Sequence, residues 1–258
     1  MRQPLKRRWR LSRWGLALAL AAAGQAAADA VGGGSYPVPA SEREHASPGE
    51  GPGTPARRVE LDIPADSYFA GAEGRSFLKY LVRCALDADT EAFLHLPGET
   101  LTFTGGVGLA PEWANRALSL AERRWVSACV YALSNKLGRS VRVNLRAAHP
   151  KIDEQTDTLE EKAAYPLHEG GFFGNLFLPQ PVSYVCAGAD REKMLDFAIG
   201  SLRLCAQPTV NTTASGERLS ACGFIITGPC NSPSSFVVGG ERFDEVVHSW
   251  LPLQPQGD

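Results

Sequence analysis

The chain has 258 residues, of which 44% are hydrophobic and 21% charged, a balance typical of a globular protein with a substantial core. Its formal net charge of −2 arises from 26 basic and 28 acidic residues, and no basic run longer than two residues follows the amino-terminal segment. Nucleic acid is therefore not expected as a partner.

The amino terminus predicts an export signal. Residues 1–13 carry six basic side chains, residues 16–23 are apolar, and Ala28-Asp29-Ala30 offers a cleavage motif of small residues. This order is typical of a secretory leader, and no later segment is long and apolar enough to span a bilayer. We expect a cleaved signal peptide over residues 1–30 and a periplasmic or secreted mature protein with no membrane span.

The next segment predicts a linker. Residues 31–58 are rich in glycine and proline and hold almost no large apolar side chain, so they cannot offset the entropy cost of ordering. We expect this stretch to be disordered and a single globular domain to cover residues 59–258.

The first half of that domain predicts two helices and a hairpin. Residues 74–86 have the apolar spacing of one buried helix face. Residues 92–96 and 100–104 flank Pro97-Gly98, a pair that suits a type II turn. Ser119 and Glu122 form a capping-box pattern before an apolar stripe that ends at Leu133. Between these elements, the glycines of residues 105–113 lack the order of a phosphate loop, and a turn before a short helix at Pro111 is expected.

The second half is less regular. Apolar and polar residues alternate over residues 140–146, as in a half-buried strand. Its polar side chains, Arg142, Asn144 and Arg146, could bind anions, but such a row is more typical of the solvent-exposed face of a sheet. A surface loop or short helix is expected over 151–162, strands over 181–187 and 223–227, and a helix after Asp190. Residues 243–251 fit helical spacing, although their β-branched content leaves a strand open. The mixture predicts an α+β domain, stapled by disulfides, with a β-hairpin or sheet and two main packed helices.

Six cysteines in an exported chain predict disulfides. Of the 15 possible connectivities we expect pairing in chain order, because two cysteines lie on the predicted helices, two bracket the short helix after Asp190, and two enclose a small loop. The expected pairs are Cys84–Cys129, Cys186–Cys205 and Cys222–Cys230. Without a C-x-x-C motif or a histidine at ligand spacing, no metal site and no cofactor is expected. A nucleophilic Cys129 is the alternative, disfavoured by its apolar neighbours.

His168 and Glu169 are the candidate catalytic residues. Glycines and two phenylalanines follow them in His168–Asn175, and a histidine oriented by a carboxylate can act as a general base. Adjacent residues on a strand point to opposite faces, so the pair needs a turn in order to cooperate. The simpler interpretation is a tight turn that anchors core aromatics. The other histidines are isolated, and nothing local activates Ser127.

Five segments together resemble a group of exported, cysteine-bearing bacterial proteins of unknown function. They are Leu81–Cys84, Gly108–Trp113, Arg124–Cys129, Glu169–Phe177 and Tyr184–Cys186. The likeness covers residues 78–230 and implies one domain with structural cysteines. It implies no activity, cofactor or partner.

Three functions remain open. The first is a binding or interaction module of the cell envelope or exterior, with an unknown ligand or protein as its partner. The second is a secreted hydrolase that uses His168 and Glu169 as an acid–base pair. The third is a structural envelope component.

Overall fold

The computed structural model describes residues 57–61, 71–134, 142–190, 205, 208–230 and 235–253. The predicted leader, most of the predicted linker and the predicted helix after Asp190 lie outside these residues. The first strand begins at Arg57, two residues before the expected domain boundary.

Helices and strands alternate irregularly along the described chain. Its helices are α2 (Ala72–Ala85), α3 (Leu120–Leu133) and α4 (Leu159–Ala164), with the 3-10 turns η2 (Pro111–Ala114) and η3 (Glu154–Thr156). Its strands are β1 (Arg57–Leu61), β2 (Thr90–Leu96), β3 (Glu99–Thr104), β4 (Asn144–Arg146), β5 (Leu167–Asn175), β6 (Val182–Ala187), β7 (Pro208–Thr212), β8 (Arg218–Ser220), β9 (Ile225–Pro229), β10 (Phe236–Val238), β11 (Glu241–Phe243) and β12 (Val247–Leu251).

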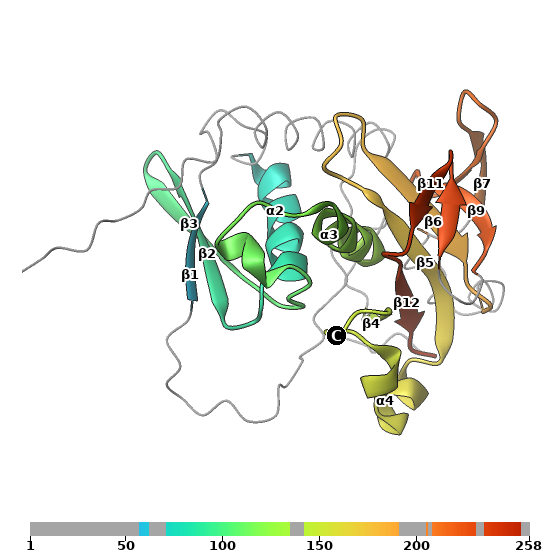
Figure 1. The fold of residues 1–258 in the computed structure, drawn as a ribbon, viewed down its shortest axis with the longest axis horizontal. Helices are drawn as coiled ribbons and strands as arrows, with labels where there is room; N and C mark the ends of the chain where they lie inside the picture. Colours follow the sequence, from blue (N-terminus) through green and yellow to red (C-terminus); the bar gives the residue numbers. More distant parts are fainter. Residues whose placement is uncertain are drawn as a thin grey trace, which may run out of the picture.

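These elements form layers, with two helices between two sheets (Figure 1). The sheet β1-β2-β3 lies beside α2, and the seven-stranded sheet β4-β12-β5-β6-β9-β8-β7 lies beside α3. The main core fills the space between these layers, because one face of each sheet and the facing stripes of both helices are apolar.

Local sequence explains the first layers. Ser119 and Glu122 make the predicted capping box, in which the Ser119 hydroxyl accepts from the Glu122 amide and the Glu122 carboxylate accepts from the Ser119 amide. The predicted hairpin is also confirmed, with Pro97-Gly98 joining β2 to β3 and Gly98 at φ 84°. That angle belongs to the second central position of a type II turn, where glycine carries no steric cost.

The predictions for the second half need correction. Residues 168–175 are a central strand of the larger sheet and not a tight turn. The segment 247–251 is a strand, the alternative left open by its β-branched content, and not the helix that its spacing favoured. The short helix α4 overlaps residues 151–162, where a loop or short helix was expected. The coarse prediction of helices mixed with sheets and stapled by disulfides is confirmed.

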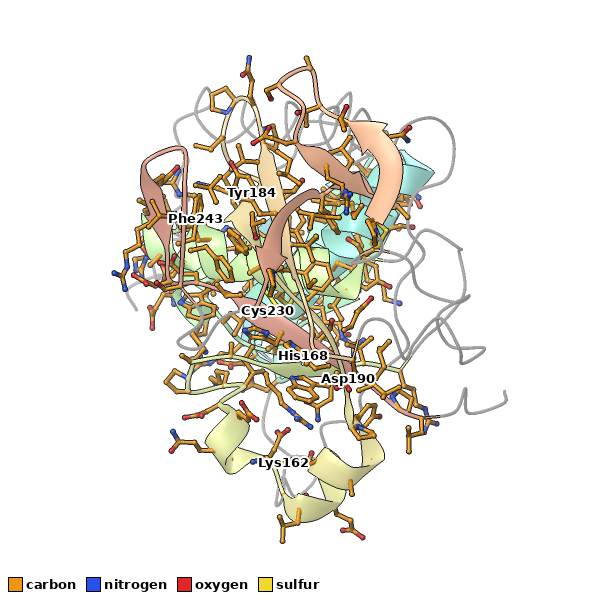
Figure 2. The ribbon with its side chains drawn as sticks, turned by 90° about the vertical axis from the view of Figure 1, so that its right-hand side faces the viewer. Lys162, His168, Tyr184, Asp190, Cys230 and Phe243 are labelled. Carbon is orange, nitrogen blue, oxygen red and sulfur yellow. A yellow bond between two sulfur atoms is a disulfide. The ribbon has the colours of Figure 1, made fainter. Side chains whose placement is uncertain are left out.

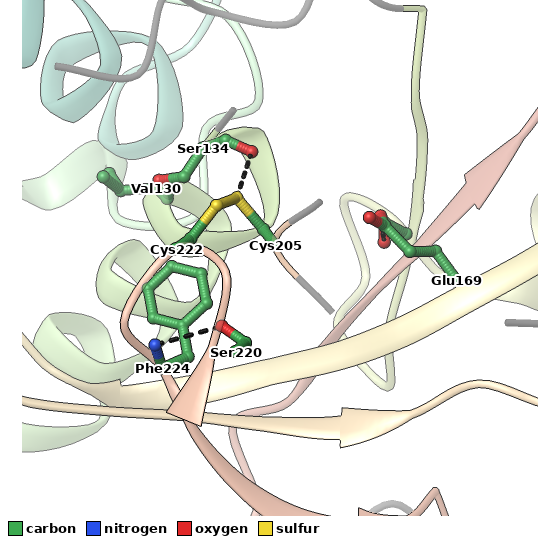
Figure 3. The surroundings of a disulfide bond; sticks show 8 residues. Val130, Ser134, Glu169, Cys205, Ser220, Cys222 and Phe224 are labelled. Carbon is green, nitrogen blue, oxygen red and sulfur yellow. Dashed lines mark hydrogen bonds between the residues drawn. A yellow bond between two sulfur atoms is a disulfide. The ribbon is translucent and has the colours of Figure 1, made fainter. Parts of the chain in front are cut away.

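Three disulfides include all six cysteines. The bridge between α2 and α3, Cys84–Cys129, is confirmed, but the other two expected pairs are wrong. The structure joins Cys186 to Cys230 and Cys205 to Cys222. Figure 3 shows the Cys205–Cys222 bridge against the end of α3, where Cys205 Sγ lies 3.2 Å from the Ser134 carbonyl oxygen.

None of the helices within the described ranges has both the length and the apolar character that a membrane crossing requires.

Candidate metal centre

The face of the seven-stranded sheet turned away from α3 carries a row of polar groups. The strand register sets Arg146 of β4 opposite His248 of β12, His248 opposite Gly171 of β5, and Gly171 opposite Cys186 of β6. Directly opposed residues share a face of a sheet, so these four positions lie side by side across four strands.

A register shift brings a second histidine into this row. From Ser249 to Trp250 the β12 strand advances one residue, while its partners on β5 advance two, from Gly170 to His168. In a regular ladder Glu169 would oppose Trp250. The extra residue in β5 is a bulge, a feature that re-aims side chains next to functional sites. It places His168 beside Trp250, on the same face as His248.

The two imidazoles are in direct contact. His168 Nε2 and His248 Nδ1 lie 2.9 Å apart, a hydrogen bond in which one ring donates and the other accepts. Burial lowers the pKa of His248 to about 3, with a further contribution from His168. Burial also lowers the pKa of His168, although Asp190 opposes this effect. Both rings are therefore neutral at pH 7, the form that binds metal ions.

An aromatic and a guanidinium group hold the pair in position. The His168 ring stacks on Trp250 with 4.6 Å between centroids, and the Arg146 guanidinium lies 4.3 Å from the centroid of the Trp250 ring. Arg146 is itself fixed by a buried ion pair with Asp157, at 2.7 Å between Nε and Oδ2. Stacking and cation–π contact together restrict the rotation of His168.

The Cys186–Cys230 disulfide lies next to the histidine pair. A Cβ atom on Gly171 would be 2.8 Å from both Cys186 Sγ and His248 Cε1, so only glycine lets the sulfur and the imidazole approach at this point. One nitrogen of each histidine and Cys230 Sγ all lie within 4.8 Å of one another. Figure 2 looks onto this face and shows His168 and Asp190 below Cys230, with Tyr184 and Phe243 above it.

An aromatic cluster next to the site packs against the Cys186 end of the disulfide. Phe173, Tyr184, Phe236 and Phe243 pack together with Cys186, and the small hairpin of β10 and β11 supplies two of these rings. The cluster buries Cys186 completely, whereas Cys230 remains half-buried.

Glu169, the second candidate catalytic residue, lies on the other face of the sheet. Its carboxylate accepts a hydrogen bond from the Ser249 hydroxyl at 2.6 Å, and Ser249 follows His248 on β12. Successive strand residues point to opposite faces, so the Glu169 carboxylate and the His168–His248 contact are on opposite sides of the sheet. The His168 imidazole contacts His248 of β12 and not its neighbour in sequence.

Other residues considered from the sequence have structural contacts. The Ser127 hydroxyl donates to the Arg123 carbonyl at 2.6 Å and accepts from the Leu176 amide at 2.8 Å, which ties α3 to the chain after β5. Cys129 is bridged to Cys84. Arg146 is buried, not on the wet face of a sheet as expected, whereas Arg142 is exposed.

Sequence reasoning missed His248 because 80 residues separate it from His168. The available signal was the alternation of His248 and Trp250, which in a strand places both side chains on one face. This alternation indicates a site only when His168 is also assigned to a strand that pairs with the strand of His248.

This chain matches no protein-family model, no curated protein and no solved structure in the comparisons made.

Proposed function

We propose that this protein is an exported binding protein, stabilised by disulfides, whose ligand is a transition-metal ion held between His168 and His248. The proposal depends on one observation, the 2.9 Å contact between the half-buried residues His168 and His248, through Nε2 and Nδ1, on the face of the sheet turned away from α3. The leader in the sequence and the three disulfides support a periplasmic or extracellular location.

The geometry of the nitrogen pair suits a shared ion. Two nitrogens at about 2.05 Å from a tetrahedral metal are about 3.3 Å apart. The pair is at 2.9 Å, so an ion replaces the shared hydrogen after a small separation of the rings. The ring that donates this hydrogen takes it up again at its other nitrogen, and no net proton is released.

The donor type selects the class of ion. Imidazole nitrogen suits zinc, copper and nickel, whereas calcium and magnesium prefer oxygen ligands. The proposed ligand is therefore a late transition-metal ion, with zinc as the simplest probe.

The test is a stoichiometry measurement on the purified, oxidised mature protein. Equilibrium dialysis against Zn²⁺ followed by metal analysis should give one ion per chain in the wild type. His168→Asn and His248→Asn should lose this ion. His95→Asn is the matched control, because His95 is an exposed histidine whose Nε2 contacts the Glu60 carboxylate at 2.7 Å on a different sheet.

The result for the control decides the interpretation. Loss of zinc in both site variants but not in His95→Asn supports the proposal. Unchanged stoichiometry in His248→Asn, with circular dichroism showing an intact fold, contradicts it.

The hydrolase that uses His168 and Glu169 stays a prediction from sequence. Their side chains make separate contacts, to His248 and to Ser249 respectively, so each would have to act without the other.

A further inference from the structure

The three disulfides differ in how well a thiol can reach them. Both sulfurs of Cys84–Cys129 belong to residues that are 0% exposed, and those of Cys205–Cys222 to residues that are 0% and 2% exposed. Cys186 is also fully buried, but Cys230 is half-buried and lies beside His168 (Figure 2). Thiol–disulfide exchange requires a thiolate to attack one sulfur directly. Cys230 is the one of the six cysteines that is not fully buried, and we infer that an external dithiol attacks this disulfide there.

Backbone hydrogen bonds also hold the segment that ends at Cys230. The Cys230 amide donates to the Ala187 carbonyl at 2.9 Å, directly after β9 pairs in parallel with β6. This ladder holds Cys230 next to Cys186 when the sulfur–sulfur bond is broken. The Cys230 sulfur therefore stays near the histidine pair after reduction.

Reduction changes the ligands that the site offers. In the oxidised protein His168 and His248 contribute two nitrogens, and the disulfide sulfur is a poor ligand. In the reduced protein the Cys230 thiolate joins them, because its sulfur already lies within 4.8 Å of both nitrogens. Two nitrogens and one thiolate form a three-residue set typical of zinc sites that keep an open position, and the thiolate also favours Cu(I).

We propose that the Cys186–Cys230 disulfide is a redox gate on this metal site, so that reduction converts weak binding by two histidines into tight binding by two histidines and a thiolate. This inference rests on the metal-binding function proposed above and adds its regulation.

The chemical step balances with a dithiol as the reductant. One thiolate of the dithiol attacks Cys230 Sγ, the bond to Cys186 breaks, and Cys186 leaves as a thiolate. The second thiolate of the dithiol then releases Cys230 and closes the reductant's own disulfide. Two electrons and two protons pass from the dithiol to the cysteine pair, and the Cys230 thiol gives its proton to solvent when the metal binds.

The experiment compares zinc affinity before and after mild reduction. The protein is treated with dithiothreitol, the reagent is removed under nitrogen, and alkylation with peptide mapping checks that only Cys186 and Cys230 are free. Competition with a chromophoric chelator should show zinc affinity at least tenfold higher in the reduced protein. Co²⁺ should give a thiolate-to-metal charge-transfer band in the reduced protein only.

Two variants make the test independent of the reductant. Cys186→Ser leaves Cys230 as a permanent thiol, and it should bind zinc tightly and show the cobalt band without reduction. Cys230→Ser should keep the weak, two-histidine affinity under all conditions. A cobalt thiolate band in Cys230→Ser contradicts the assignment of Cys230 as the ligand.

The outcomes separate the two proposals. Equal zinc affinity in oxidised and reduced wild type overturns the gate while the two-histidine site stands. Histidine-independent zinc binding in the oxidised protein overturns the proposed function, whatever reduction does. Zinc binding that requires both His248 and reduction contradicts the two-histidine site proposed for the oxidised protein and restricts metal binding to the reduced form.

Discussion

Acid should destabilise the metal-free protein through His248. Folding holds this imidazole neutral, because burial lowers its pKa to about 3, while an unfolded chain protonates it below about pH 6.5. The unfolded state therefore binds more protons between these two values. The free energy of unfolding should fall as the pH drops from about 6.5 toward 3, and it should not respond to this group above pH 7.5.

The size of the effect follows from the two pKa values. Between pH 7.5 and pH 4.5, a shift from 6.5 to about 3 removes about 2–3 kcal/mol of stability. Urea unfolding at both pH values measures it, and His248→Asn supplies the reference because it removes the titrating ring. The free energy of unfolding of the wild type, relative to that of the variant, should be lower by this amount at pH 4.5 than at pH 7.5. Parallel pH dependence in wild type and His248→Asn would refute the reasoning.

Three further substitutions test the fold and the site. Ser127→Ala leaves the buried Leu176 amide without its acceptor and should lower the free energy of unfolding by about 1–3 kcal/mol, measured by urea titration. Ser119→Ala removes the acceptor for the Glu122 amide in the capping box, and the expected loss by the same titration is about 1 kcal/mol. Gly171→Ala inserts a methyl group 2.8 Å from a disulfide sulfur and an imidazole carbon, and it should weaken zinc binding at least tenfold in competition assays. Zinc affinity equal to that of the wild type in this last variant would mean that the ion lies elsewhere.

Local signals in the sequence predicted the local structure. The Ser119–Glu122 pair acts over three residues, and Pro97-Gly98 needs only the two strands that it joins, so each was readable without knowledge of the fold. The Cys84–Cys129 bridge followed from two amphipathic helices with cysteines on their apolar faces. In each case the residues that decide the outcome lie on elements that the sequence identifies.

The errors arise where distant strands meet. Cys186 pairs with Cys230 because β6 and β9 are parallel neighbours, and a parallel pair requires a long connection that sequence spacing cannot reveal. The strand β5 was interpreted as a turn because its glycines are unfavourable in strands. In the folded sheet Gly171 is required for a different reason, the close approach of His248 and Cys186.

The adjacent residues His168 and Glu169, which the sequence indicated as an acid–base pair, do not contact one another through their side chains at the site. Because of the bulge in β5, the Glu169 carboxylate contacts Ser249 and the His168 ring contacts His248. The side chains of these two neighbours therefore lie on opposite faces of the sheet. Removing the bulge would oppose Glu169 to Trp250 and take His168 away from the disulfide. The chemistry of this face therefore depends on one extra residue in the ladder. That dependence makes the contact between the imidazoles, and not the His168-Glu169 sequence, the feature to test for function.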